Sequence, residues 1–149
     1  MPSPLTLEYY HRRAAGGAGL LVTDGIALKD PLSQFRSTIP NLHGAALPAW
    51  KSITQAVHDE GAAIVAQLWH AGLSREAEHC EDPRPSIGPG NRLPDGGRTG
   101  RAMSHNDIAN TITAYGRAAR NAYEAGFDGV NVYGAHRYLI DQSFWDQTN

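Results

Sequence analysis

Residues 127–142 read FDGVNVYGAHRYLIDQ, and this stretch decides the fold class. The apolar run from Gly129 to Val132 is short and rich in valine, a residue that is enriched in strands. It stops at Tyr133, and His136 and Tyr138 follow within six residues. Proteins with a parallel sheet bind ligands at the carboxyl ends of their strands, so this strand end is a candidate site.

The same layout of a helical pattern, a glycine and a strand-like run occurs twice more upstream. The runs are LLVT at 20–23 and AIVAQL at 63–68. Alternating helices and strands predict βαβ crossovers and a parallel α/β sheet, as a doubly wound sheet or a (β/α) barrel. The residues expected on the buried faces of the three helices are Leu7, Tyr10 and Ala14, then Trp50, Ile53 and Val57, then Ile108, Ile112, Tyr115, Ala119 and Ala122.

Helix boundaries are marked by polar caps and glycines. Ser3 followed by Pro4 predicts the start of the first helix, and Ser104 with Asp107 resembles a capping box for the third. Glycines predict the three ends, because glycine accepts the left-handed conformation that closes many helices. They are Gly16 and Gly17, Gly61, and Gly126.

Polar and aromatic side chains follow all three strand-like runs. They are Thr23 and Asp24 after the first, Gln67, Trp69 and His70 after the second, and Tyr133 and His136 after the third. The carboxyl ends of parallel strands open on one side, so we expect these residues to converge on one ligand site. Individually, Gln67 could instead satisfy a backbone group, and Trp69 and Tyr138 could serve only in packing.

Two long connections interrupt the pattern, at 29–46 and 71–103. The second is dense in glycine, proline and charge. Loops of this length are uncommon inside compact domains unless they act as lids or binding loops. The segment 71–103 is therefore either a substrate-binding excursion or a disordered loop.

The composition indicates one globular domain. Of the 149 residues, 41% are hydrophobic and 19% charged, and the formal net charge is −2. Without a basic stripe, neither nucleic acid nor an anionic membrane is an expected partner. Cys80 is the single cysteine, and the first residues lack the apolar run of a signal peptide, so the expected location is the cytoplasm.

A metal site is not expected, although the chain has seven histidines. None of them forms an HExxH motif, and Cys80 has no CxxC partner. One alternative stays open at this point. His70, His136 and Asp24 could serve a metal-dependent barrel hydrolase.

Three segments together resemble a known family. EYYHRRAAGGAGLLVTDG at 8–25, GAAIVAQLWHAG at 61–72 and NAYEAGFDGVNVYGAHRYLIDQSFW at 121–145 are similar to the Old Yellow Enzyme family of flavin oxidoreductases. The resemblance implies a (β/α)₈ TIM barrel with FMN at the carboxyl ends of its strands. It also implies that NAD(P)H reduces the flavin, which then reduces the C=C bond of an α,β-unsaturated carbonyl compound.

The resemblance assigns a role to individual residues. Gln67 and Thr23 would bind the cofactor. Tyr133 and His136 would hold the substrate's carbonyl oxygen, and Tyr138 would supply a proton. Tyr133 stands where the family usually has histidine, and Arg137 stands where it has glycine.

Length sets the last expectation. A (β/α)₈ barrel typically needs about 250 residues. Residues 1–149 therefore predict a single incomplete barrel domain with three to four βα units. The alternative to an ene-reductase is a non-catalytic remnant, either truncated or degenerate. Besides an enone-type small molecule, the expected partners are a second copy or a complementing chain.

Overall fold

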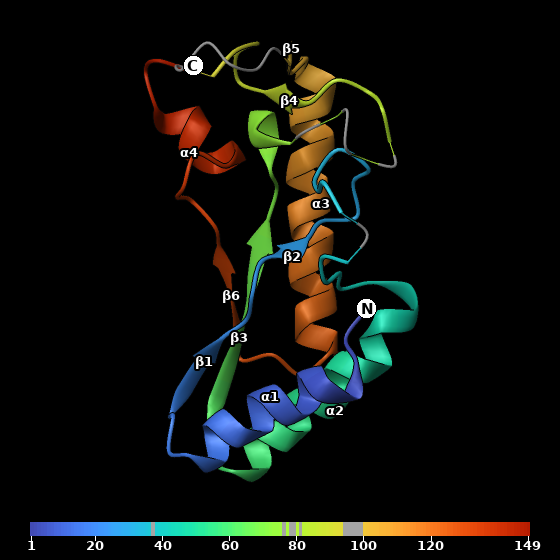
Figure 1. Ribbon diagram of the computed structural model, residues 1–149, viewed down its shortest axis with the longest axis vertical. Helices are drawn as coiled ribbons and strands as arrows, with labels where there is room; N and C mark the ends of the chain where they lie inside the picture. The colour runs from blue at the N-terminus through green and yellow to red at the C-terminus, as the bar shows by residue number, and fades with distance from the viewer. Residues whose placement is uncertain (37, 76, 78–79, 81, 94–99) are drawn as a thin grey trace.

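The computed structural model describes residues 1–36, 38–75, 77, 80, 82–93 and 100–149. Figure 1 shows a central sheet with two helices crossing below it and a long helix beside it. The helices are α1 (Pro4–Ala15), α2 (Leu47–Asp59), α3 (His105–Glu124) and α4 (Leu139–Phe144). The strands are β1 (Leu20–Val22), β2 (Ile26–Ala27), β3 (Ala63–Trp69), β4 (Ile87–Gly88), β5 (Arg101–Ala102) and β6 (Gly129–Val132).

The main sheet is parallel and centred on β3. β1 pairs with the first half of β3, and β2 pairs with its last two residues. β6 pairs with the middle of β3, from Val65 to Leu68, on the opposite edge. Among β1, β3 and β6 the spatial order follows the chain order, as it does in a (β/α) barrel. The predicted parallel α/β arrangement is confirmed.

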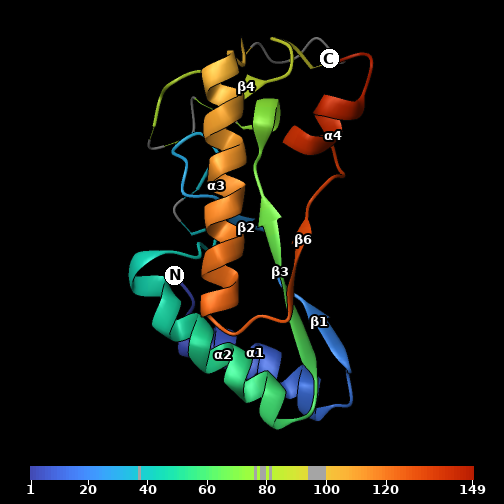
Figure 2. The ribbon, with the colours of Figure 1, turned by 180° about the vertical axis from the view of Figure 1, so that it is seen from behind.

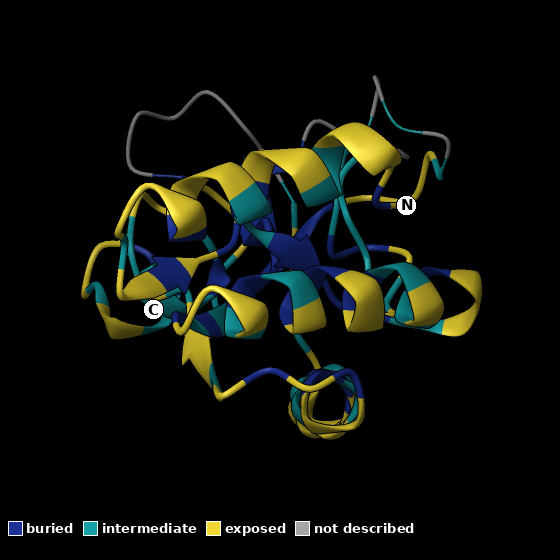
Figure 3. Ribbon diagram, turned by 90° about the horizontal axis from the view of Figure 1, so that it is seen from below, coloured by how far each residue is buried: buried dark blue, intermediate teal, exposed yellow. Residues whose placement is uncertain are grey.

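The core lies between the sheet and the helices. α1 and α2 pack against each other. Figure 3 shows the buried residues gathered on the inner sides of the helices. The predicted faces of α1 and α2 are confirmed, because Tyr10, Trp50 and Val57 are all buried. Ile64, on β3, is fully buried in the same cluster.

The predicted helix boundaries are also confirmed. The Ser3 and Ser104 hydroxyls each accept a hydrogen bond from the backbone three residues on, completing capping boxes. Gly126 follows α3 with φ of +86°, which requires glycine. A Cβ there would lie 3.0 Å from Thr54 Oγ1, whose hydroxyl donates to the Ala125 carbonyl over 2.7 Å.

The predicted buried face of α3 is wrong in its N-terminal half. Ile108 and Ile112 are 44% and 66% exposed, while Tyr115 and Ala119 are partly buried. The residues that face the core are Thr111, Ala114, Ala118 and Ala122. Small side chains let the helix lie close to the sheet, and the larger isoleucines remain on its flank. A pattern weighted by hydrophobicity therefore selects the wrong stripe.

The two long connections contain structure that the sequence did not predict. In the second, Ile87–Gly88 of β4 pairs in parallel with Arg101–Ala102 of β5. The Arg75 guanidinium is buried and donates to the carbonyls of Gln34, Asp82 and Arg84. The described part of 71–103 is thus packed against the first connection. Among the described residues, no helix is both long and apolar enough to cross a membrane.

Asp128 joins three elements at the amino end of the sheet. Its Oδ2 accepts the Ile64 amide over 2.7 Å and lies 2.9 Å from His58 Nε2. The bond from the Ile64 amide, and then His58, lower the pKa of the Asp128 carboxyl. One carboxylate therefore fixes the start of β6 against β3 and the end of α2.

We expect Asp128→Asn to lower the free energy of unfolding by about 1 kcal/mol at pH 7, because it removes a charged acceptor that is partly exposed. The pKa of the Asp128 carboxyl is lower in the folded than in the unfolded state. The stabilisation is therefore fully present above the unfolded pKa of about 3.9, and it is lost as pH falls through the lower folded-state pKa. Urea unfolding at pH 7 and pH 3 measures the difference. Asp146→Asn is the control, since Asp146 is exposed. Equal losses at both pH values for Asp128→Asn would contradict this role.

Candidate active site

The carboxyl ends of β1, β3 and β6 open into a pocket of about 490 Å³. The side chains lining it include Thr23, Asp24, Gln67, Trp69, Tyr133 and Tyr138. The predicted convergence of the three strand ends is therefore confirmed for Thr23, Asp24, Gln67, Trp69 and Tyr133, whereas His136 is not among the residues that line the pocket. The sequence did not single out Phe35, Arg36 and Ile39, which line the pocket from the first long connection.

Trp69 forms one wall of this pocket and positions its neighbours. Its ring meets Phe35 and Tyr138 edge-on, with centroids 5.4 Å and 5.1 Å apart. A Cβ at Gly25 would lie 3.2 Å from Trp69 Cγ, so the chain passes close to the indole there. These contacts support the interpretation of Trp69 as a packing residue. They also fix the position of the Tyr138 ring.

Gln67 and Thr23 link the strands beneath the pocket. The Gln67 amide nitrogen Nε2 donates to Asn131 Oδ1 over 3.2 Å. The Thr23 hydroxyl accepts the Gln67 backbone amide over 3.0 Å and donates to the Asp24 carbonyl over 2.9 Å. Within the described chain, the Gln67 side-chain carbonyl oxygen has no hydrogen-bond partner. Gln67 can therefore accept from a ligand, whereas the Thr23 hydroxyl proton is already engaged.

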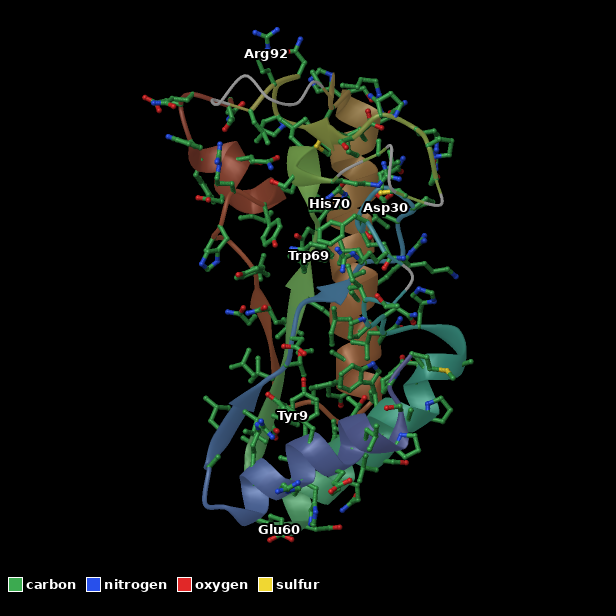
Figure 4. The ribbon with its side chains drawn as sticks, in the orientation of Figure 1. Tyr9, Asp30, Glu60, Trp69, His70 and Arg92 are labelled. Atoms are coloured by element: carbon green, nitrogen blue, oxygen red, sulfur yellow. The ribbon has the colours of Figure 1, made fainter. Side chains whose placement is uncertain are left out.

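His70 lies behind the pocket and does not line it. Its ring is 1% exposed, and Nδ1 accepts the Gly72 amide over 3.0 Å. Figure 4 shows His70 beside Asp30 just after the end of β3, and His70 Nε2 lies 3.8 Å from Asp30 Oδ2. The His70 carbonyl accepts the Leu139 amide over 3.1 Å. His70 thus ties β3 to the start of α4.

The metal-dependent alternative finds no support in the part of the chain that the structure describes. No group of three or more His, Cys, Asp or Glu side chains there could hold a metal ion. His70 is engaged with Gly72, and His136 with Tyr133. His79, next to Cys80 in the sequence, lies outside the described residues.

Tyr133, His136 and Tyr138 form one cluster at the end of β6. Tyr133 Oη and His136 Nδ1 are 2.5 Å apart, and the Tyr133 and Tyr138 ring centroids are 5.4 Å apart. Burial, and then the neighbouring Tyr133, raise the pKa of the Tyr138 phenol. Tyr138 consequently keeps its proton across the neutral range.

The turn between β6 and α4 has an unusual backbone. His136 and Arg137 have φ of +58° and +62°, in the left-handed region that non-glycine residues seldom adopt. Gln142 Nε2 and Ser74 Oγ donate to the Arg137 carbonyl, and Asp141 Oδ2 accepts the Arg137 amide over 2.7 Å. These bonds hold a conformation that costs roughly 1–2 kcal/mol per residue.

Gln142 is a further residue of the site that the sequence did not single out. It is completely buried, and its Oε1 accepts the Leu73 amide over 3.0 Å. A Cβ at Gly72 would lie within 3.0 Å of both the Gln142 amide and Leu139 Cα. Only glycine at position 72 leaves room for this bond. The sole sequence signal is the position of Gln142 at the end of LIDQ.

We expect Arg137→Gly to raise the free energy of unfolding by about 1 kcal/mol, because glycine adopts the left-handed conformation without steric cost. The matched control is Arg120→Gly in the interior of α3, which should lower it by about 1 kcal/mol. Urea unfolding of both variants gives the two opposite signs. A loss of stability in Arg137→Gly as large as that in Arg120→Gly would contradict the strained turn.

Comparisons with known proteins identify relatives of the whole chain. Putative 12-oxophytodienoate reductase 4 from Oryza sativa subsp. japonica is 37% identical over 155 residues. Putative 12-oxophytodienoate reductase-like protein 1 from Arabidopsis thaliana is 34% identical over 164 residues. Each match covers 100% of this chain but only 40% and 47% of the respective relative.

Solved structures give the same picture. Morphinone reductase in complex with tetrahydroNAD superposes with a TM-score of 0.88 at 28% identity, covering 100% of this chain and 45% of that one. The crystal structure of Old Yellow Enzyme from Pichia sp. AKU4542 gives 0.87 at 30% identity, covering 100% and 42%. The chain thus spans less than half the length of these proteins, and its fold is part of their TIM barrel.

The description of the matching family is NADH:flavin oxidoreductase / NADH oxidase, and the match extends over residues 2–149. Sequence match, barrel order and strand-end pocket agree, and the chain belongs to this family of flavin oxidoreductases.

Proposed function

We propose that this chain supplies the substrate-polarising and proton-donating part of an FMN-dependent oxidoreductase. The reaction would use NAD(P)H to reduce the C=C bond of an α,β-unsaturated carbonyl compound. The observation that carries the proposal is the cluster of Tyr133, His136 and Tyr138 next to the Gln67 pocket. Relatives named as reductases of 12-oxophytodienoate and morphinone support it.

The pocket fits the ring system of a flavin better than its phosphate. Gln67 offers a free carbonyl oxygen that can accept from the N–H of a pyrimidine edge. Among the described residues that line this pocket, Arg36 is the one cationic side chain. Gln67 would therefore hold the ring, with Thr23 fixing the strands beneath it. When bound, the flavin supplies the hydride.

His136 and Tyr133 would act together on the substrate oxygen. If the Tyr133 hydroxyl donates to His136 Nδ1, a neutral His136 carries its proton on Nε2. This leaves His136 Nε2–H as the donor to a carbonyl oxygen. Such a donor stabilises the negative charge that develops on that oxygen during reduction.

Tyr138 would deliver the proton to the α-carbon. Its pKa is raised above the ordinary tyrosine value of about 10, so the phenol keeps its proton at neutral pH. Contact with Trp69 fixes the ring, so that the proton is held in position before the substrate arrives.

A second candidate is a non-catalytic remnant. Arg137 favours it, because a bulky residue there adopts a strained left-handed backbone conformation beside the proposed catalytic residues.

We also propose a cytoplasmic location, which is supported by the single cysteine of the chain.

We expect the isolated chain to bind FMN weakly or not at all, because Arg36 is the one cationic side chain that the described pocket lining offers to a phosphate. Titration of FMN with the chain, followed by flavin fluorescence, measures the affinity. Saturable binding in the submicromolar range would show that these residues suffice for the cofactor.

The catalytic roles are best measured in a complete barrel. A chimaera would carry this chain in place of the matched segment of the Oryza sativa relative. We expect Tyr138→Phe to slow flavin reoxidation by cyclohexenone by roughly 10²-fold, in the range of general acid catalysis, while flavin reduction by NADPH stays nearly unchanged. Stopped-flow absorbance separates the two half-reactions. Tyr123→Phe on the exposed side of α3 is the control.

In the same chimaera, we expect His136→Ala to slow reoxidation by roughly 10²–10³-fold, as for a lost oxyanion donor. The control is His105→Ala, since His105 is exposed at the first position of α3. Unchanged enone reduction in both His136→Ala and Tyr138→Phe would rule out the proposed roles. A chimaera that binds FMN but never reduces enone would favour the remnant.

A further inference from the structure

The strand-end pocket is lined from two sides of β3. Figure 2 shows β6 and α4 on one side of β3, and β2 with the first long connection on the other. The Tyr133–His136 pair belongs to the first side, because it follows β6. Phe35 and Arg36 line the pocket from the connection on the second side. A ligand that is held at His136 and reaches Arg36 therefore extends across the end of β3.

Aromatic rings form the wall between these two sides. Tyr133, Tyr138, Trp69 and Phe35 follow one another, with successive ring centroids 5.4, 5.1 and 5.4 Å apart. The other three rings all pack against Trp69 in one apolar cluster. Ligand pockets commonly combine such apolar surface with a few polar groups that fix the orientation of the ligand. The middle of a ligand that lies along this wall should accordingly be apolar.

Arg36 places a positive charge at the far end of the aromatic wall. Its Cζ lies 5.8 Å from the Phe35 ring centroid, within the range of a cation–π contact. Its guanidinium forms no ion pair with a carboxylate of the described chain. Asp24, at the end of β1, is the one acidic side chain among the described residues that line the pocket. The guanidinium fork matches a carboxylate with two parallel hydrogen bonds, so Arg36 is available to an anionic group of a ligand.

The connection that carries Arg36 is held by two buried hydrogen bonds to the segment that follows β3. The Ala71 amide donates to the Ser33 carbonyl over 2.8 Å, and Arg75 Nε donates to the Gln34 carbonyl over 3.0 Å. Ser33 and Arg75 are 0% and 1% exposed, so water does not compete for these bonds. A side chain on a backbone that is already fixed loses less conformational freedom when it binds a ligand.

We propose that Arg36 is a specificity-determining residue that binds a carboxylate at the remote end of the enone substrate. The inference rests on the proposed function, since the Tyr133–His136 pair is taken to hold the carbonyl end. It adds the chemical class of the substrate. The apolar body lies on Trp69 and Phe35 and ends in a carboxylate. NAD(P)H does not match this arrangement, because a ribose and phosphates, and no apolar body, follow its nicotinamide ring.

Binding to the FMN-loaded, oxidised chimaera tests this role without turnover. The probes are benzalacetone with a para-carboxylate and the matching para-carboxamide, which share the enone and the apolar body and differ in charge. Isothermal titration calorimetry gives the two dissociation constants. The chimaera should prefer the carboxylate by about five- to tenfold, between an exposed ion pair and a hydrogen bond to a buried charge. Arg36→Gln should abolish the preference, and Arg36→Lys should retain part of it, since lysine keeps only the charge.

Arg12→Gln is the matched control. It removes the same charge from a side chain that is 76% exposed on α1 and does not line this pocket, so the preference for the carboxylate should persist. Equal affinity for the two probes, or a preference that Arg36→Gln leaves in place, would overturn the proposal. Loss of FMN or slower flavin reduction by NADPH in Arg36→Gln, as large as the effect on the carboxylate, would overturn it in favour of a phosphate.

The same measurements separate this inference from the proposed function. The readout is the binding of unreacted ligands, whereas the enone chemistry is measured by flavin reoxidation. A carboxylate preference that depends on Arg36, in a chimaera that never reduces cyclohexenone, would support the carboxylate site and contradict the proposed reaction. Reduction of cyclohexenone without any carboxylate preference would contradict the role of Arg36 alone.

Discussion

Pairing of β3 along both of its edges is the interaction on which the rest of the structure depends. β1 and β2 pair with one edge of Ala63–Trp69, and β6 pairs with the other. The ladder extends past the strand ends, because Thr23 donates to the Val65 carbonyl and Tyr133 to the Leu68 carbonyl. A shift of one residue in either register would turn the side chains to the opposite face. The register therefore determines that Thr23, Gln67 and Tyr133 meet in one pocket.

The strained turn depends on this strand as well. β3 ends at Trp69, and the carbonyl of the next residue, His70, accepts the Leu139 amide. The chain then continues to Gly72 and Leu73, which contact Gln142. Gln142 in turn holds the Arg137 carbonyl. Strained backbone persists only where the surroundings over-determine it, and it is frequent at functional sites. The left-handed pair His136–Arg137 is such a place, because Ser74, Gln142 and Asp141 all hydrogen-bond to the Arg137 backbone.

Local signals in the sequence were sufficient for α1, α2 and α3, for β1, β3 and β6 and for part of the site, but not for β2, β4, β5 or α4. Capping serines, terminal glycines and valine-rich runs predict the helices and strands through short-range effects, and parallel pairing then brings Thr23, Gln67 and Tyr133 together. Contacts between distant segments could not be predicted in this way. Phe35 and Arg36 reach the pocket from a long connection, and the exposure of Ile112 depends on which flank of α3 the sheet leaves uncovered.

Native-state hydrogen exchange of individual amides tests most directly whether β3 organises the site. If it does, the amides of Thr23, Tyr133 and Leu139, which donate to β3 and His70, should open with free energies close to that of the β3 amides themselves. Gly134, in the turn itself, should exchange far faster. The account would be contradicted if Tyr133 and Leu139 exchanged as fast as Gly134 while β3 stayed protected. The site would then move independently of the strand proposed to hold it.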